Sequence, residues 1–281
     1  MSRSLRFVSL SLVTSILFVG TGVGLSGCSQ NAFLESAKKD TDAALLFEAK
    51  KLMNKSNWSD AITLIAKMST AGRDDRGTKA VLASAYAGKC GLNLIRLADK
   101  ISNSASQNFF SVLMSGLPGS TAASVADCVS AENTLRSISD VAAERTADEN
   151  VMLAFIGFAK IGAILTTYAD TNGDGTPDPG FDSCNTAMLP DAMLREVGTG
   201  VTLAVSALAA AGGSIGAGLS DAVTNACANL ATADPAYDFC TVTTAASFSV
   251  DQTKALGGLV KSTDNPGIGT CAGSISACVC P

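Results

Sequence analysis

Apolar residues recur at helical spacing along most of the chain, beginning near residue 41. On a helix, residues three or four apart share one face. Two apolar stripes of this kind come first, one at 41–54 and one at 58–69, with a short break at Ser56-Asn57 between them. The stripes comprise Leu45, Leu46, Ala49, Leu52 and Met53, and then Ile62, Ile65 and Met68. The pattern therefore predicts a pair of helices joined by a tight connection.

The same spacing predicts further helices over the rest of the chain. We expect a short helix within 102–119 and longer ones at about 121–139, 151–168, 190–211, 216–231 and 250–261. The predicted fold class is therefore all-α. Helical hairpins that pack side by side are the expected architecture.

Two of these helices are apolar enough to raise the question of a membrane span. The helix at 151–168 follows a capping box formed by Thr146 and Glu149 and is apolar on every face. Lys160 interrupts its uncharged run too early for a bilayer, so a central core helix is expected. The run between Glu196 and Asp221 has no charge but is rich in small residues, which favours close packing in a core; a membrane span is the alternative.

The N-terminus carries a different signal. Arg3 and Arg6 precede an apolar run from Phe7, and the run ends at Leu25-Ser26-Gly27-Cys28. A basic start, a short apolar stretch and small residues before a cleavage point are typical of a secretory signal. The last four residues resemble the lipobox of bacterial lipoproteins. An uncleaved anchor helix and an ordinary secretory signal with a chance cysteine are the alternatives.

The lipobox resemblance has several implications. Residues 1–27 would be a signal peptide, and Cys28 would carry diacylglycerol and an amide-linked acyl chain such as palmitate, so the chain is anchored rather than spanning. Residues 28–40 would form a lipidated tether. In lipoproteins of this type an aspartate after the cysteine favours inner-membrane retention; Ser29 stands there. The resemblance thus implies the outer membrane, on its periplasmic side or at the cell surface.

Charge narrows the range of partners. Loss of Arg3 and Arg6 reduces the 20 basic residues to 18 against 25 acidic ones, a net charge of −7. An acidic chain without basic clusters has no electrostatic footprint for nucleic acid. We therefore expect no nucleic-acid partner, and membrane contact only through the lipid anchor.

Nine cysteines fit an exported protein. With Cys28 assigned to lipid, eight remain, and an even set in an oxidising compartment predicts disulfides. The eight are Cys90, Cys128, Cys184, Cys227, Cys240, Cys271, Cys278 and Cys280. We expect Cys90 to pair with Cys128 and Cys227 with Cys240. Cys278 and Cys280 should each pair elsewhere, one of them with a core helix, and the glycine- and serine-rich tail around them should depend on disulfides for its order.

The first two helices resemble a known repeat. Trp58-Ser59-Asp60-Ala61-Ile62 is similar to the middle of a tetratricopeptide repeat, a helical hairpin of 34 residues. A shift of 34 residues pairs Ala49 with Ala83, but pairs Ala61 with Ile95. The resemblance implies two degenerate repeats over 41–105, followed by a helical domain at 106–281. Any amphipathic helical hairpin shows similar spacing, and this simpler interpretation stays open.

A run of aspartates follows the helix at 151–168. Calcium prefers several oxygen ligands, which alternate at loop positions 1, 3, 5, 7 and 9 around a glycine at position 6. Asp170, Asn172, Asp174, Gly175, Thr176 and Asp178 occupy positions 1, 3, 5, 6, 7 and 9. The segment 170–182 resembles the calcium loops of EF-hand and thrombospondin type 3 modules.

The loop departs from that pattern at its end. Phe181 stands at position 12, where these loops have a bidentate acid, and Asp182 comes one residue late. Without an aligned bidentate ligand, we expect a weak structural calcium site. Four aspartates with no basic neighbour in sequence repel one another unless a cation is present, which favours calcium over an ion-free turn. A surface turn without an ion is the alternative.

Enzymatic chemistry finds little support. The chain has no histidine, which excludes Ser-His and Cys-His nucleophiles and histidine-ligated metals. A carboxylate pair for glycoside hydrolysis stays open, but no pair stands out. We expect a non-enzyme: a lipid-anchored scaffold or adaptor that binds a protein partner through helical-hairpin surfaces, like periplasmic tetratricopeptide lipoproteins. The alternative is a lipoprotein that holds a small apolar molecule in its helical core.

Overall fold

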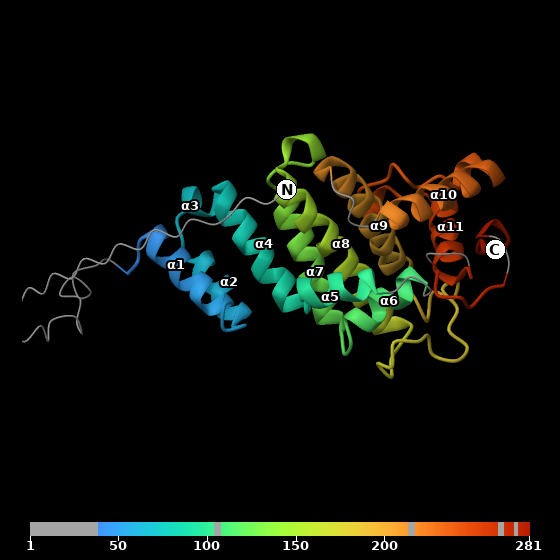
Figure 1. Cartoon of the computed structure of the whole chain (residues 1–281), viewed down its shortest axis with the longest axis horizontal. Coiled ribbons are helices and arrows are strands. Elements are labelled where there is room, and N and C mark those ends of the chain that lie inside the picture. The colour runs from blue at the N-terminus through green and yellow to red at the C-terminus, as the bar shows by residue number, and fades with distance from the viewer. Residues whose placement is uncertain (1–38, 104–107, 213–216, 264–266, 273–274) are drawn as a thin grey trace, which may run out of the picture. The chain divides into compact units, whose positions relative to one another are not determined.

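The computed structural model describes residues 39–103, 108–212, 217–263, 267–272 and 275–281, without the side chains of 213–223. In this part the regular structure is helical and contains no strand, which confirms the predicted all-α class (Figure 1). Residues 1–38, which include the predicted signal peptide, Cys28 and most of the predicted tether, lie outside the described residues.

Eleven α-helices lie in the described part. Their bounds are α1 Asp42–Met53, α2 Trp58–Ala66, α3 Thr70–Asp74, α4 Arg76–Cys90, α5 Leu94–Ser102, α6 Phe109–Gly116, α7 Ala122–Arg136, α8 Ala147–Tyr168, α9 Asp191–Ala211, α10 Ala217–Ala233 and α11 Val250–Lys261. Short 3-10 turns occur at Ala142–Glu144, Pro235–Tyr237, Ala245–Ser247 and Ile275–Cys278.

Local side chains fix several helix ends. The predicted capping box forms at α8, where Glu149 N donates to Thr146 Oγ1 at 3.2 Å and Thr146 N donates to Glu149 Oε2 at 2.8 Å. α8 therefore begins at Ala147. At the other end of a helix, Gly91 terminates α4 with a φ of 103°, a left-handed conformation that costs glycine little.

Helix α8 is the centre of the main core. It packs against α9, α6 and α7, and most of its residues are buried. In the described part, α8 and α9 are both long and apolar enough to cross a membrane, and both are mostly buried against the rest of the chain. Their burial agrees with the expected core helices.

Small residues bring α8 and α9 close together. A Cβ atom added at Gly157 of α8 would lie 2.8 Å from the carbonyl oxygen of Gly200 on α9. One added at Gly200 would lie 2.9 Å from Cγ1 of Ile161. The glycines and alanines of α9 thus serve its contact with α8, whereas α10 makes only a small contact with α9.

The first two helices have a small core of their own. Ala49, Ala61, Ile65 and Met68 form this cluster, separate from the main core. Trp58 joins it to α4, because its ring lies so close to Gly88 that an added Cβ there would approach ring atoms to 2.7 Å. α1 and α4 begin 34 residues apart, at Asp42 and Arg76, and Ala49 and Ala83 are both fully buried.

The second predicted hairpin departs from the first. α4 packs most extensively on α7, and α5 packs on α6. Ala83, Ala87 and Leu97 of α4 and α5 therefore belong to the main core.

The tail has more support than disulfides alone. Ile268 and Ile275 are buried, and the amide of Cys271 donates to the carbonyl oxygen of Lys261 at the end of α11 at 2.7 Å. The order of this segment therefore does not depend on disulfides alone, contrary to expectation. Two buried isoleucines and a backbone hydrogen bond also attach it to α11.

Candidate functional site

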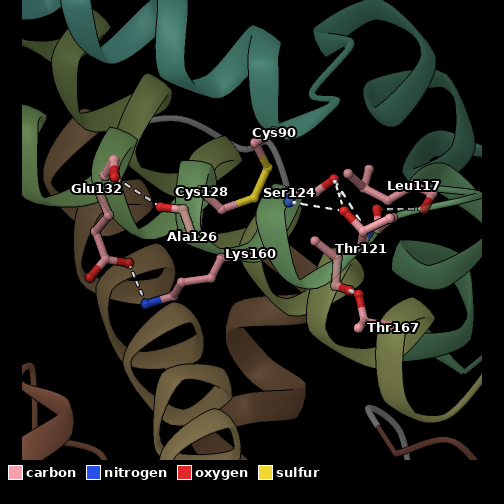
Figure 2. Close-up of a disulfide and its surroundings, with 12 residues drawn as sticks. Cys90, Leu117, Thr121, Ser124, Ala126, Cys128, Glu132, Lys160 and Thr167 are labelled. Atoms are coloured by element: carbon pink, nitrogen blue, oxygen red, sulfur yellow. Dashed lines mark hydrogen bonds and ion pairs between the residues drawn. A yellow bond between two sulfur atoms is a disulfide. The ribbon is translucent and has the colours of Figure 1, made fainter.

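Four cysteine pairs lie at disulfide distance in the described part. The predicted pairs Cys90–Cys128 and Cys227–Cys240 are confirmed, with Cα atoms 5.1 and 6.1 Å apart. Both values fall within the usual range for a disulfide. The first pair joins the end of α4 to the middle of α7 (Figure 2).

The remaining pairs are Cys184–Cys280 and Cys271–Cys278, with Cα atoms 5.3 and 6.1 Å apart. Cys278 and Cys280 do pair with different partners, as expected. Neither partner lies in a core helix, however: Cys184 sits in the turn before α9 and Cys271 in the tail.

The aspartate loop follows α8 directly and folds around its own backbone. Asp170 is 1% exposed, and its carboxylate accepts hydrogen bonds from the amides of Asp174 at 3.0 Å and Gly175 at 2.8 Å. Gly175 has a φ of 85°, the left-handed turn that position 6 of such loops requires. The side chain of Asn172 also accepts from the amide of Asp174, at 2.9 Å.

The carboxylates of Asp174 and Asp178 accept hydrogen bonds from threonine hydroxyls. Asp174 Oδ1 accepts from the hydroxyl of Thr176 at 2.6 Å, and Asp178 Oδ2 accepts from the hydroxyl of Thr171 at 2.5 Å. The hydroxyl bonds from Thr176 and Thr171 hold the pKa of Asp174 and the pKa of Asp178 below the usual aspartate range. Both groups are therefore ionised at neutral pH.

At the end of the loop, a core residue occupies position 12, where a calcium loop has an acid. Phe181 is buried in the main core and so anchors the loop where a calcium loop would place its last ligand. Asp182 instead accepts from the amide of Cys184 at 3.0 Å and lies 3.7 Å from Lys261 Nζ of α11. A basic neighbour thus does exist, supplied by a distant helix rather than by adjacent residues.

A metal needs several of these groups at one point. Among the residues that the structure describes, no three aspartate, glutamate or cysteine side chains gather closely enough to share an ion. In this conformation the loop oxygens are turned toward backbone amides and threonine hydroxyls. The side chains of the loop are not arranged as a calcium coordination shell, although the backbone turn at Gly175 is that of a calcium loop.

The α1–α2 hairpin exposes an aromatic side chain. Phe47 of α1 is 63% exposed and lies two residues before the buried Ala49, on the opposite side of the helix. Lys51 Nζ lies 5.8 Å from the centre of the Phe47 ring. We call Phe47 and the neighbouring exposed residues Ala43, Lys50, Lys51 and Asn54 the α1 face.

The start of α1 is fixed by a carboxylate. Asp42 accepts hydrogen bonds from the amide of Ser69 at 2.7 Å and from the Ser69 hydroxyl. These bonds, the hydroxyl bond first, lower the pKa of Asp42. α1 is therefore held against the start of α3, and the α1 face is directed away from this junction.

The core contains a buried ionic cluster whose members could not be paired from sequence patterns. Lys160 of α8 is fully buried, and its Nζ lies 2.6 Å from Glu132 Oε2 of α7 (Figure 2). The same Nζ lies 2.7 Å from Glu196 Oε2 of α9. It also donates to the hydroxyl of Thr199 at 2.5 Å. The Glu132 contact is an ion pair, and the other oxygen of the same carboxylate lies 3.7 Å from Arg136 Nη1.

Sequence spacing gave one usable signal for this cluster. A single lysine in the middle of an otherwise apolar helix requires a buried counter-charge, since an unpaired buried charge is very costly. Nothing in the spacing identified the partners. Comparisons with protein-family models, with curated proteins and with solved structures gave no match for this chain.

Proposed function

We propose that this protein is a non-enzymatic, lipid-anchored scaffold or adaptor of a bacterial outer membrane. In this proposal Cys28 carries the lipid, and the helical hairpin next to the tether binds a protein partner. The observation that carries the proposal is the α1–α2 hairpin, which has its own small core and leaves Phe47 63% exposed. An exposed aromatic side chain beside cationic ones is typical of contact surfaces.

The position of α1 supports this assignment. It is the first described helix, and it packs mainly on α2 and α4, apart from the Asp42–Ser69 junction at the start of α3. α4, by contrast, is covered by α7. The 34-residue spacing between the starts of α1 and α4 is also that of tetratricopeptide arrays, whose helices bind peptides and proteins.

The core favours a scaffold over a carrier of small apolar molecules. Large side chains fill the space between α6, α7 and α8, among them the fully buried Phe110, Leu113, Leu135 and Leu153. The side chains pack as in an ordinary protein interior. Recovery of a bound apolar molecule by solvent extraction of the purified protein would favour the carrier instead.

Photo-crosslinking in cells tests the adaptor proposal. A benzophenone analogue of phenylalanine at position 47 should give a discrete crosslinked protein band. The same analogue at Val141, which is 53% exposed and outside the hairpin, is the matched control and should not give this band. No band at position 47, or the same band from both positions, contradicts a partner on the α1 face.

The anchor has an independent test. The intact mass of the mature protein should exceed that of residues 28–281 by the mass of the lipid, and Cys28→Ser should abolish this excess and release the protein from membranes. An unmodified Cys28 would remove the anchor from the proposal and leave the α1 face untouched.

We also propose that the loop at 170–182 binds calcium weakly. Its backbone turn and its ionised aspartates support the proposal, but binding requires Asp174 and Asp178 to turn away from Thr176 and Thr171. Without a bidentate acid at position 12, the expected affinity is in the roughly 0.1–1 mM class. Calorimetry with millimolar calcium should show binding that Asp174→Asn abolishes; an unchanged heat signal and melting temperature would exclude the site.

A further inference from the structure

A pocket of about 190 Å³ opens where the first turns of α9 and α11 meet the disulfide Cys184–Cys280. Its walls come from four stretches far apart in sequence, near residues 183–186, 191–195, 250–254 and 280–281. The disulfide joins two of these stretches, and Ser183 Oγ donates to the carbonyl oxygen of Gly257 on α11 at 2.7 Å. Its walls are therefore fixed relative to one another.

Two cationic side chains line the pocket, Arg195 of α9 and Lys254 of α11. Both are half-buried, and within the described ranges neither forms an ion pair. Asp191, at the exposed rim, is the carboxylate side chain among the lining residues. The lining side chains carry two half-buried cations and one exposed carboxylate, a net positive charge that the α-carboxylate of the exposed Pro281, also at the pocket, opposes. Partial burial of the two cations weakens their screening by solvent.

The arginine is held in place by a threonine. Arg195 Nε donates to Thr253 Oγ1 at 3.1 Å, and the Thr253 hydroxyl donates to the carbonyl oxygen of Ser249 at 2.8 Å. Thr253 is itself buried. This chain of bonds fixes the guanidinium by one nitrogen, and its other two nitrogens have no hydrogen-bond partner among the described residues.

The remaining wall is apolar. Leu194, Val250 and the disulfide line it, and Val250 is 66% exposed at the mouth. At about 190 Å³ the pocket is smaller than the roughly 300–1,000 Å³ of sites for drug-sized ligands. The ligand that fits it has few heavy atoms, with an anionic head and a short apolar part.

We propose that this pocket binds a small organic carboxylate. The two free nitrogens of Arg195 match the two oxygens of a carboxylate, and Lys254 adds a point charge. The short apolar part lies against Val250 and Leu194. This site is independent of the α1 face and of the lipid anchor.

Titration of the full-length purified protein tests the site, with butyrate as the probe and inorganic phosphate in a parallel arm. Butyrate should bind saturably, and Arg195→Gln should weaken it by about tenfold or more, as loss of a charge-assisted pair does. Lys254→Gln should weaken it less. Lys67→Gln, an exposed lysine at the end of α2, is the matched control and should change nothing.

Several outcomes would overturn the proposal. They are the absence of saturable butyrate binding, binding that neither Arg195→Gln nor Lys254→Gln weakens, and an equal loss with Lys67→Gln. Tighter binding of phosphate than of butyrate with the same dependence on Arg195 would overturn the carboxylate assignment. Circular dichroism melts show whether each variant is folded. If one of the two pocket variants has lost its fold, the butyrate titration of the other pocket variant tests the proposal.

Discussion

At the residue scale, Glu149 connects two helices. Its carboxylate caps α8 through the amide of Thr146 and accepts hydrogen bonds from Arg76 of α4 at 2.7 and 2.5 Å. The bond from Arg76, more than any other contact, lowers the pKa of Glu149. A carboxylate whose folded-state pKa is lowered stabilises the fold above its unfolded pKa, and this contribution is lost as the pH falls through the folded value.

Glu149→Gln should therefore destabilise the protein at pH 7 and not at low pH. Gln can still cap α8, so the loss is that of the charge, about 0.5–1 kcal/mol because Arg76 is half exposed and screened. Urea denaturation at pH 7 and pH 3 measures it. Glu48→Gln, which removes an exposed pair with Lys51, is the control and should cost less. An equal loss at both pH values would show that the effect is not electrostatic.

The contacts that could be predicted from the sequence are those between residues close together along the chain. Thr146 and Glu149 could be assigned because a capping box spans three residues. Lys160 could be noticed but not paired, since Glu132 and Glu196 are 28 and 36 residues away and meet it only after three helices have packed. For the same reason Asp182 was placed with the loop aspartates, although Lys261 of α11 lies beside it.

At the element scale, the ionic cluster of Lys160, Glu132 and Glu196 joins α7, α8 and α9. Lys160→Met should destabilise the protein by about 3 kcal/mol, because it leaves the buried Glu132 with only Arg136, 3.7 Å from its other oxygen, as a counter-charge. Chemical denaturation measures the loss, and Lys67→Met at an exposed position is the control. Adding Glu132→Leu to Lys160→Met should restore part of the stability. A loss below about 1 kcal/mol for Lys160→Met would show that the cluster contributes little.

Helix positions followed from periodicity, but helix partners did not. The apolar spacing located most of the helices to within a few residues, since each pattern is set by its own turn of 3.6 residues. It did not show that the small residues of α9 would contact α8, or that α4 would pack on α7 instead of on α5. The apolar pattern of a helix shows which of its faces is buried. It does not show which other helix covers that face, because many helices have similar apolar faces.

At the scale of the whole molecule, the disulfides connect distant segments. Cys184–Cys280 closes a loop with a sequence separation of 96, whereas Cys271–Cys278 closes one of 7. By the loop-entropy relation, the long loop contributes about 4.7 kcal/mol and the short one about 2.4 kcal/mol. Cys184→Ser/Cys280→Ser should therefore lower the free energy of unfolding more than Cys271→Ser/Cys278→Ser. Guanidinium denaturation of both double variants decides; an equal or reversed order would contradict the loop argument.

The even set of cysteines predicted a disulfide framework for the molecule, and the apolar spacing predicted its all-α class. The small pocket at Arg195 and Lys254 could not be predicted, because its walls come from segments nearly a hundred residues apart.

The central claim is that the α1 face holds a protein partner. Quantitative mass spectrometry of proteins that copurify with the wild type, Phe47→Ala and Val141→Ala tests it most directly. Both variants remove an exposed apolar side chain, so folding should be unaffected in each. We predict that one or a few proteins are retained by the wild type and by Val141→Ala and are lost with Phe47→Ala. An identical set of proteins from all three would contradict the account.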